Sequence, residues 1–382
     1  MTGGSETAER QRRRAYADRV KEALLRRTIA DVAPGTALRE GLERILRGQT
    51  GALIVLGHDK VIDEISSGGF ALDVPFSATE LRELAKMDGA IVVEHSSGRI
   101  VRAAVQLVPD ASIHTEETGT RHRTADRVSQ QSGMPVISVS KSMQIISVYV
   151  GGERYVVEDS TTILSRADQA LGTLERYKLR LDEVSATLAA LEVEDLVTLR
   201  DVAHVAQRQQ MVRRIAAELE GYIRELGTDG RLLALQYEEL MAGVPEDRVL
   251  IVRDYLPGKK RHTGIKSSAA SVTAAVQALD SLDAEELLEL NLIAEALGYP
   301  GPRGEDLDRA LAPRGDRLLA RVPRLPEVVM DRLVEHFGSL QRLLAAEIDD
   351  LRDVEGVGEG RAQSVREALS RLAESSVVER YG

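Results

Sequence analysis

The sequence predicts a multidomain protein in which an N-terminal α/β domain with a mixed central sheet precedes all-α regions. Between residues 51 and 155, β-branched runs of strand length alternate with helical patterns. After about residue 160, apolar residues recur at spacings of three and four, which is typical of amphipathic helices. The 382 residues also exceed what one ordinary core accommodates, so we expect two or three domains.

Composition shifts divide the chain into four expected segments. Residues 1–14 are polar and end in a basic cluster, which predicts a flexible N-terminal extension. Residues 15–158 form the α/β domain, and residues 159–300 form a helical spine whose apolar stripe is too short to favour a coiled coil with another chain. A stretch rich in proline, glycine and arginine then leads into a compact domain of short helices over residues 301–382.

Strands of the α/β domain are expected at five apolar, β-branched runs, which are residues 52–56, 90–93, 100–108, 136–139 and 145–150. The capping box that Ser77 begins predicts a helix up to Met87, so that Asp88 lies at the boundary between this helix and a strand. Thr124 is the expected N-cap of a short helix that ends at Gly133. The residues just before Thr124 then form a loop that leads into this helix.

Composition excludes several classes of protein. The chain has no cysteine, which excludes disulfides, thiolate zinc sites and cysteine nucleophiles. Its net charge of −11 is unfavourable for a protein that coats nucleic acid indiscriminately, so any contact with DNA must be local. No apolar run reaches membrane-spanning length, and the N-terminus lacks the apolar core of a signal peptide. We therefore expect a cytoplasmic protein with no membrane partner.

Two motifs in the α/β domain are candidates for nucleotide chemistry. The longer one is a run of basic and hydroxyl side chains made of Thr120, Arg121, His122, Arg123 and Thr124. It leads into a helix, whose free N–H groups and positive dipole end favour phosphate. The shorter motif contributes Asp88, and a carboxylate is the usual ligand for the magnesium ion that accompanies a nucleotide.

Each motif has a plainer interpretation when taken alone. An isolated Asp-Gly is more often a turn than a site, and a run of basic residues can be a solvated face. Their occurrence together, each at an element boundary of one α/β domain, favours a ligand site. The sequence contains neither the P-loop pattern Gly-x-x-x-x-Gly-Lys-Ser/Thr nor a Gly-x-Gly-x-x-Gly pattern that precedes a helix, which disfavours P-loop and Rossmann nucleotide sites.

The C-terminal domain contains a glycine hairpin between two helical patterns. Gly356 and Gly358 permit close approach of the backbone to one DNA phosphate, while Val357 between them anchors the turn. Such contacts do not read bases. The candidate DNA-binding residues are Gly356, Val357, Gly358, Gly360 and Arg361, and the candidates for further ionic contacts upstream are Arg314, Arg321 and Arg324.

The order and spacing of Asp88-Gly89-Ala90 and of the run from Gly119 to Ala125 resemble the active site of the diadenylate cyclase family. Together with the helix-hairpin-helix pattern, the resemblance covers the whole chain. It implies a nucleotidyltransferase that condenses two ATP molecules into cyclic di-AMP and two pyrophosphates. It also implies that this activity is coupled to the scanning of DNA for branched or damaged structures, as in a DNA-damage checkpoint that serves DNA repair.

The resemblance also implies roles for individual residues. Asp88 is expected to hold Mg²⁺ or Mn²⁺ and to activate the 3′-hydroxyl, and Arg121, His122 and Arg123 are the other expected catalytic residues. The residues expected to bind the substrate ATP are Gly68, Gly69, Gly89, Ala90, Leu107, Thr120, Arg121, His122, Arg123 and Thr124.

The reaction is symmetric in its two ATP molecules, so two cyclase domains must face each other, most simply about a twofold axis. In the family this arrangement is part of a homo-octamer, and the DNA partner is branched, as in a Holliday junction, which implies a location at the nucleoid. An alternative interpretation is a structural DNA-binding protein whose α/β domain senses ATP without catalysis. Asp88 distinguishes the two, because a sensor needs phosphate contacts but no carboxylate at the 3′-hydroxyl.

Overall fold

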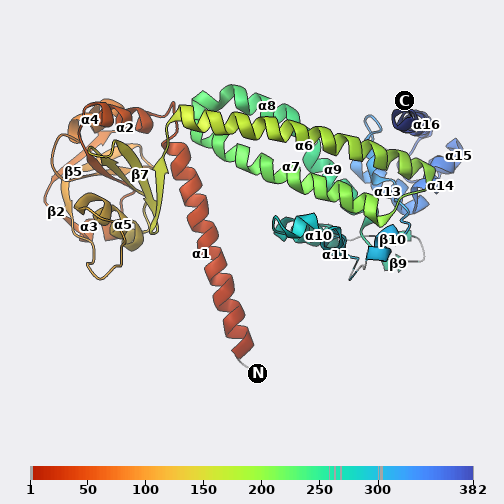
Figure 1. Cartoon of the computed structure of the whole chain (residues 1–382), viewed down its shortest axis with the longest axis horizontal. Coiled ribbons are helices and arrows are strands. Elements are labelled where there is room, and N and C mark those ends of the chain that lie inside the picture. The colour runs from red at the N-terminus through yellow and green to blue at the C-terminus, as the bar shows by residue number, and fades with distance from the viewer. Residues whose placement is uncertain are drawn as a thin grey trace. The chain divides into compact units, whose positions relative to one another are not determined.

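The computed structural model describes residues 3–257, 259–261, 264–266, 269–299, 301 and 304–381. These residues form two compact units, of which the first comprises Met1–Gln169 and Glu220–Leu235 and the second comprises Ala170–Leu219 and Gln236–Gly382. Two long helices, α6 (Ser160–Glu194) and α7 (Leu199–Leu226), have residues in both units. Figure 1 shows the elements of the chain.

The first unit contains the predicted α/β domain. Its strands are β1 (Ala52–Leu56), β2 (Ser66–Ser67), β3 (Phe70–Pro75), β4 (Ala90–Glu94), β5 (Arg99–Leu107), β6 (Val136–Ser140), β7 (Ile145–Val150) and β8 (Glu153–Val157). Its helices before α6 are α1 (Gly3–Asp31), α2 (Ala37–Arg47), α3 (Lys60–Glu64), α4 (Ala78–Leu84) and α5 (Thr120–Ser132).

The prediction of a mixed central sheet is confirmed. The strand order is β2-β5-β4-β1-β6-β7-β8, with β3 paired to β5. β1 is parallel to β4 and antiparallel to β6, so both pairing types meet at β1. The five strands expected from apolar runs correspond to β1, β4, β5, β6 and β7. The strands β2, β3 and β8 have no such run, because many of their side chains are exposed or only partly buried.

Helices cover both faces of the sheet, and β1 is buried at every position between them. Ile54 packs on the face that α2 and α4 cover, in one cluster with Leu42 and Leu81. The next residue, Val55, points to the opposite face and belongs to the cluster that contains Val128 of α5. In Figure 1, α2 and α4 lie above the sheet and α3 and α5 lie below it.

The N-terminal residues extend this unit as a helix. The segment 1–14, which the sequence predicts to be a flexible extension, is helical from Gly3 onward because α1 continues without interruption to Asp31. Its flexibility stays a prediction, as do the boundaries of the four expected segments. The end of α7 also returns to the first unit, where the Thr228 N–H donates to the Pro34 carbonyl at 3.1 Å.

The second unit is built mainly from helices, as the sequence predicts, with one antiparallel pair of short strands that the sequence does not predict. Its elements after α7 are α8 (Arg231–Met241, shared with the first unit), α9 (Val244–Tyr255), β9 (Lys259–Arg261), β10 (Gly264–Lys266), α10 (Ala269–Ser281), α11 (Leu290–Ala296), α12 (Asp316–Ala320), α13 (Glu327–Phe337), α14 (Leu340–Ala345), α15 (Ile348–Arg352) and α16 (Glu359–Tyr381). The helices α12 to α16 share one apolar core. Within the described part of the chain, no helix is both long and apolar enough to cross a bilayer.

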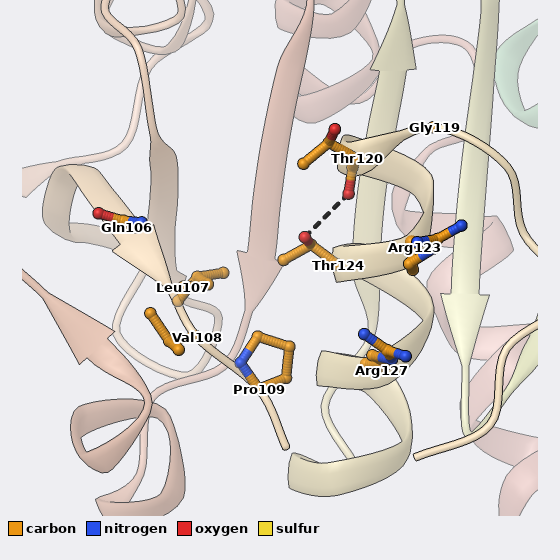
Figure 2. A pocket seen from close by; sticks show the side chains of 9 residues that line it. All are labelled: Gln106, Leu107, Val108, Pro109, Gly119, Thr120, Arg123, Thr124 and Arg127. Carbon is orange, nitrogen blue, oxygen red and sulfur yellow. Dashed lines mark hydrogen bonds between the residues drawn. The ribbon is translucent and has the colours of Figure 1, made fainter. Parts of the chain in front are cut away.

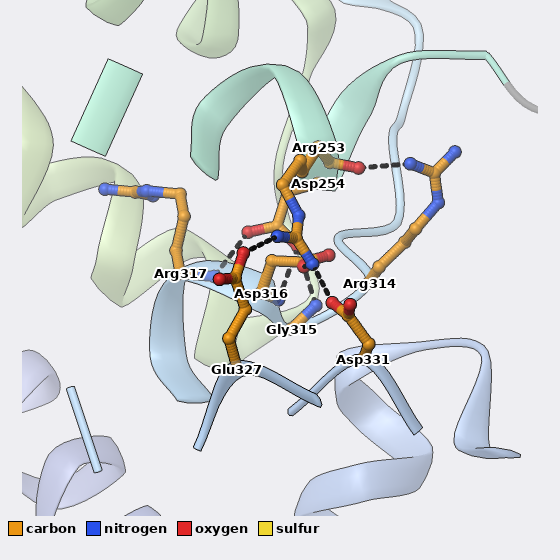
Figure 3. Close-up of polar contacts among 8 residues, drawn as sticks. All are labelled: Arg253, Asp254, Arg314, Gly315, Asp316, Arg317, Glu327 and Asp331. Carbon is orange, nitrogen blue, oxygen red and sulfur yellow. Dashed lines mark hydrogen bonds and ion pairs between the residues drawn. The ribbon is translucent and has the colours of Figure 1, made fainter. Parts of the chain in front are cut away.

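A buried cluster of charged groups joins α9 to α12 (Figure 3). The Asp254 carboxylate on α9 accepts hydrogen bonds from the backbone N–H groups of Gly315, Asp316 and Arg317 at 2.7, 2.8 and 2.8 Å, and thereby caps the N-terminus of α12. The Arg317 guanidinium pairs with Glu192 of α6 at 2.5 Å, and both side chains are buried. Removing one partner of a buried pair is strongly destabilising, so this cluster fixes α12 on the helices of its own unit.

Candidate functional site

The register of the sheet brings the predicted motifs to one edge. Ala90, the first residue of β4, pairs with the beginning of the parallel β1 and with Val105 near the end of the antiparallel β5. Asp88 and Gly89 therefore enter β4 at the edge where β5 ends at Leu107. Strand order and direction thus unite segments that are distant in sequence.

Glycines allow close backbone packing at this edge. Gly89 has φ +114°, and a Cβ atom there would overlap the backbone of Ala104 in β5. Gly69 has φ +77°, and a Cβ atom there would meet the carbonyls of Ala103 and Ala104. Ala104 has φ +52° and lies where the pairing of β4 with β5 is irregular. Both glycines therefore pack against one bulge of β5, whereas a Cβ atom at Gly68 would meet open space.

Helix α5 begins five residues earlier than the sequence predicts. Gly119, with φ +88°, is the N-cap and has no side chain to contribute, and the first intrahelical bond runs from the Arg123 N–H to the Gly119 carbonyl at 3.1 Å. The Thr124 hydroxyl does not cap the helix but bonds the Thr120 carbonyl at 2.9 Å inside it. The basic run thus forms the first turn of α5. Its first N–H groups have no intrahelical partner and are available to an anion.

A cavity of about 420 Å³ lies between this turn and the end of β5 (Figure 2). It is lined by Gln106, Leu107, Val108, Pro109, Gly119, Thr120, Arg123, Thr124 and Arg127. The side chains of Thr120 and Thr124 point from α5 toward the segment that follows Leu107. Two of the described lining residues are arginines and none is acidic, so the cavity is suited to an anionic ligand.

Four of the predicted ATP-binding residues line this cavity, namely Leu107, Thr120, Arg123 and Thr124. Arg127 lines it as well, which the sequence interpretation missed. It lies four residues after Arg123 and therefore on the same face of α5. Its guanidinium is held by a hydrogen bond from Nε to the Ile113 carbonyl at 2.9 Å. The other predicted residues, Gly68, Gly69, Asp88, Gly89, Ala90, Arg121 and His122, are not among the lining residues.

Arg121 lies at the same edge without lining the cavity. A Cβ atom at Gly51, the residue before β1, would overlap the Arg121 guanidinium. This places Arg121 over the start of β1, at the edge where Asp88 and Leu107 also lie. A cationic side chain is therefore present on each side of the first turn of α5.

Asp88 is exposed. Its carboxylate has no hydrogen-bond or ion-pair partner within the described residues. No group of three or more His, Asp and Glu side chains in the described ranges is arranged to hold a metal ion. A single free carboxylate nevertheless suits Mg²⁺, which commonly binds one or two carboxylates together with substrate phosphates.

His122 faces the sheet and not the cavity. Its imidazole is buried, and Nδ1 lies 2.8 Å from the Tyr149 hydroxyl of β7. Burial lowers the pKa of His122, and the neighbouring Arg154 and Arg121 charges add to this effect while Glu117 opposes it. On α5, Thr120, Arg123, Thr124 and Arg127 occupy one face, and His122 lies on another. The His122 side chain therefore packs α5 against the sheet, while its backbone N–H is one of the first N–H groups of α5 that have no intrahelical partner.

The C-terminal glycine hairpin lies between α15 and α16. Gly356 has φ +90°, Val357 is buried in the core and Gly358 is exposed with open space around its Cα. The Ala362 N–H bonds the Gly358 carbonyl at 2.9 Å, so α16 begins directly at the hairpin. Arg361, predicted as a DNA contact, donates to the Gly356 carbonyl and thereby stabilises the turn. The hairpin has an exposed backbone at a helix N-terminus, as a phosphate contact requires.

Three family models match successive parts of the chain. One described as DisA bacterial checkpoint controller nucleotide-binding matches residues 39–154, and one described as DisA bacterial checkpoint controller linker region matches residues 157–305. One described as helix-hairpin-helix motif matches residues 322–378. The cavity and Asp88 lie within the first of these matches, and the glycine hairpin lies within the third.

Relatives match nearly the whole chain. A protein named DNA integrity scanning protein DisA from Streptomyces griseus subsp. griseus is 64% identical over 94% of this chain and 95% of its own length. A protein of the same name from Frankia alni is 63% identical over 94% of this chain and 98% of its own length. A crystal structure of a DacA double mutant from Staphylococcus aureus is 25% identical, with a TM-score of 0.28 over 32% of this chain and 85% of that one.

Proposed function

The chain belongs to the family of DNA integrity scanning proteins, and we propose that it is a diadenylate cyclase that condenses two ATP molecules into cyclic di-AMP and two pyrophosphates. The family models support a nucleotide-binding domain and a helix-hairpin-helix domain for DNA. The observation that carries the proposed activity is that the cationic cavity at the start of α5 and the partner-free Asp88 carboxylate share one edge of the sheet.

The chemistry requires each 3′-hydroxyl oxygen to attack the α-phosphorus of the other nucleotide. A new P–O bond forms, the bond to the β-phosphate bridging oxygen breaks, the hydroxyl loses its proton and pyrophosphate leaves. Because the transition state carries dispersed negative charge, catalysis consists mainly of positioning and charge neutralisation. Arg123, Arg127 and the free N–H groups of α5 provide donors for the triphosphate, with Arg121 beside them, and Leu107 and the Gly89 backbone shape the nucleoside end.

Asp88 is proposed to accept the hydrogen bond of the attacking 3′-hydroxyl and to hold a divalent cation. Its exposed, partner-free carboxylate fits such an ion when the substrate phosphates supply further oxygen ligands. Bound Mg²⁺ or Mn²⁺ would supply charge neutralisation at the reacting phosphate and a lower pKa for the hydroxyl. The carboxylate would then orient this hydroxyl toward the cavity edge.

One domain holds one nucleotide, so the proposal requires two cyclase domains that face each other about a twofold axis. We propose that this pairing occurs within a homo-octamer in the cytoplasm, at the nucleoid. The C-terminal domain would bind branched DNA such as a Holliday junction, and this binding would change how cyclase domains meet. Synthesis of the second messenger would then report DNA damage to repair pathways.

The test is to incubate the purified full chain with ATP and either Mg²⁺ or Mn²⁺ and to separate the products by chromatography. We expect cyclic di-AMP and pyrophosphate in a ratio of one to two. The variant Asp88→Asn should form no product in this assay. Glu83→Gln is the matched control for it, because Glu83 is an exposed carboxylate on α4 whose partner is Lys86. ATP binding without any cyclic dinucleotide would instead identify the protein as an ATP sensor.

A further inference from the structure

A cavity of about 490 Å³ lies within the second unit. Its walls come from the end of α9 and the residues that follow it, from Tyr299, from the segment 309–314 and from the turn between α13 and α14. Small-molecule sites commonly have a volume of about 300–1,000 Å³ and lie where separate structural elements meet. The volume and the position of this cavity are therefore typical of a small-molecule site.

The charges that line this cavity favour an anion. Arg309 and Arg342 are exposed, and neither guanidinium has a hydrogen-bond or ion-pair partner among the residues that the structure describes. The only acid among the described lining residues is Asp254, which is buried and whose carboxylate accepts three backbone N–H groups at the start of α12. Two cations are thus left to form charge-assisted hydrogen bonds with a ligand.

An aromatic ring lines the cavity beside one of these cations. The guanidinium carbon of Arg309 lies over the Tyr299 ring, 6.0 Å from its centroid. The ring is half-buried, and the Tyr299 hydroxyl donates to the Tyr255 carbonyl at 2.5 Å, which holds the ring in place. Nucleobases stack on tyrosine rings and on guanidinium planes. This pair therefore provides a surface for a planar group.

Hydrogen bonds hold the walls of the cavity in position. Arg314 is buried, and its guanidinium donates to the carbonyls of Arg253 and Leu256; the first of these bonds is drawn in Figure 3. The backbone at Arg309 is held against the start of α7, because the Leu199 N–H bonds the Arg309 carbonyl at 2.9 Å. A preformed wall lowers the conformational entropy that is lost when a ligand binds.

We propose that this cavity binds a small nucleotide, whose base stacks on the pair of Tyr299 and Arg309 and whose phosphate pairs with Arg342. A bare phosphate ion would leave the aromatic surface unused. Two unpaired cations suit one small ligand, whereas a DNA-binding surface neutralises several phosphates. The site is separate from the cavity at α5, because its lining residues belong to the second unit and those of the α5 cavity belong to the first.

A nucleotide in this cavity connects two parts of the second unit. Arg309 lies in the segment that is bonded to the start of α7, and Arg342 lies on α14. A ligand that contacts both side chains joins the long helices of the spine to the C-terminal helices. Because the folded state alone offers this site, the bound nucleotide also raises the free energy of unfolding of the second unit.

The experiment is photo-crosslinking of the full chain with 8-azido-AMP, after which mass spectrometry locates the labelled residues. We expect label within residues 299–342, separate from any label in the α/β domain, and we expect excess AMP to prevent it. The double variant Arg309→Gln/Arg342→Gln should reduce this label on the order of tenfold, because both charge-assisted contacts are lost. Arg371→Gln is the matched control, since it removes an exposed charge on α16 that does not line the cavity.

Several outcomes would overturn the inference. Label confined to the α/β domain would show that nucleotide binds only there, and an equal loss in Arg371→Gln would show that the attraction is not specific to the cavity. Protection by inorganic phosphate at the same concentration as AMP would identify a site for a bare anion. Protection by duplex DNA but not by AMP would make the cavity part of a DNA-binding surface. If the double variant melts at a lower temperature than wild type, the single variant Arg342→Gln decides, because this side chain is exposed.

Discussion

The N-termini of α5 and α16 are built alike but differ in the charges around them. Helix α5 follows Gly119, with φ +88°, and α16 follows the hairpin of Gly356 and Gly358. These glycines contribute no capping side chain, so each helix start has N–H groups available to an anion. Around α5 the ionisable residues that line the cavity are Arg123 and Arg127.

The start of α16 carries acids together with arginines, since Arg361 donates to the Gly356 carbonyl and Arg332 pairs with Glu355. Asp353, Glu355 and Glu359 lie in or next to the hairpin, and all three are exposed. A triphosphate that reacts needs fixed positive charge, because more negative charge develops in the transition state. A protein that scans DNA needs contacts that release readily. In the proposed function, the same backbone arrangement would serve catalysis at α5 and reversible DNA binding at α16, according to the charges placed around it.

The largest effect that distinguishes the nucleotide site from the glycine hairpin is expected from Asp88→Asn. The change keeps the volume and removes the charge that we propose to orient the 3′-hydroxyl, so cyclase activity should fall by at least about a hundredfold. Nucleotide affinity in the absence of metal and junction affinity should stay within about threefold of wild type. Product chromatography, calorimetry and gel shifts measure the three quantities. Near-wild-type turnover would remove Asp88 from the proposed site.

A smaller effect is expected at the charges around α5. Arg123→Ala should weaken binding of a non-hydrolysable ATP analogue by about 1.5–3 kcal/mol, because a charge-assisted hydrogen bond to phosphate is lost. Arg121→Ala tests the guanidinium over Gly51, which lies at the same edge but outside the cavity. Arg154→Ala is a control within the same domain, since Arg154 pairs with Glu117. Equal affinities in calorimetric titration for wild type and Arg123→Ala would mean that the basic face of α5 contacts solvent and not the nucleotide.

Part of the fold and part of the candidate site can be predicted from the sequence. Strands with a continuous buried run, such as β1, are predictable because every residue is apolar. β3 is not, because pairing with β5 holds a strand whose side chains are largely exposed and that ends at Pro75. The basic motif predicts Arg123 as part of an anion site. Gln106 and Arg127 lie outside this motif in the sequence, and only the folded structure brings them to the same cavity. The orientation of His122 depends on where α5 begins.

Substitutions in the glycine hairpin should weaken DNA binding without an effect on the cyclase domain. A Cβ atom at Gly358 meets open space, so Gly358→Val should keep the fold and obstruct the approach of phosphate, with a loss of about 1.5–3 kcal/mol in junction affinity. Gly356→Val should also destabilise the domain, because its φ is positive and its Cβ would lie 3.0 Å from Arg332 Nη1. Gly221→Ala in α7 is the control, because a Cβ atom there also has free space and Gly221 lies outside the candidate DNA-binding residues. Cyclase activity without DNA should be unchanged in all three, and full junction binding by Gly358→Val would place the DNA contact elsewhere.

The smallest expected effect concerns the packing of His122 of α5 against the sheet. Burial lowers the pKa of His122, so the folded state binds fewer protons than the unfolded state below the ordinary pKa of about 6.5. The free energy of unfolding should therefore fall as the pH drops from 7.5 to 5.5, by less than about 1.4 kcal/mol per pH unit. His122→Gln keeps a polar group near Tyr149 and should lose this share of the pH dependence. Melting temperatures of both proteins across this range measure the effect, and identical pH profiles would show that His122 is not held neutral against the sheet.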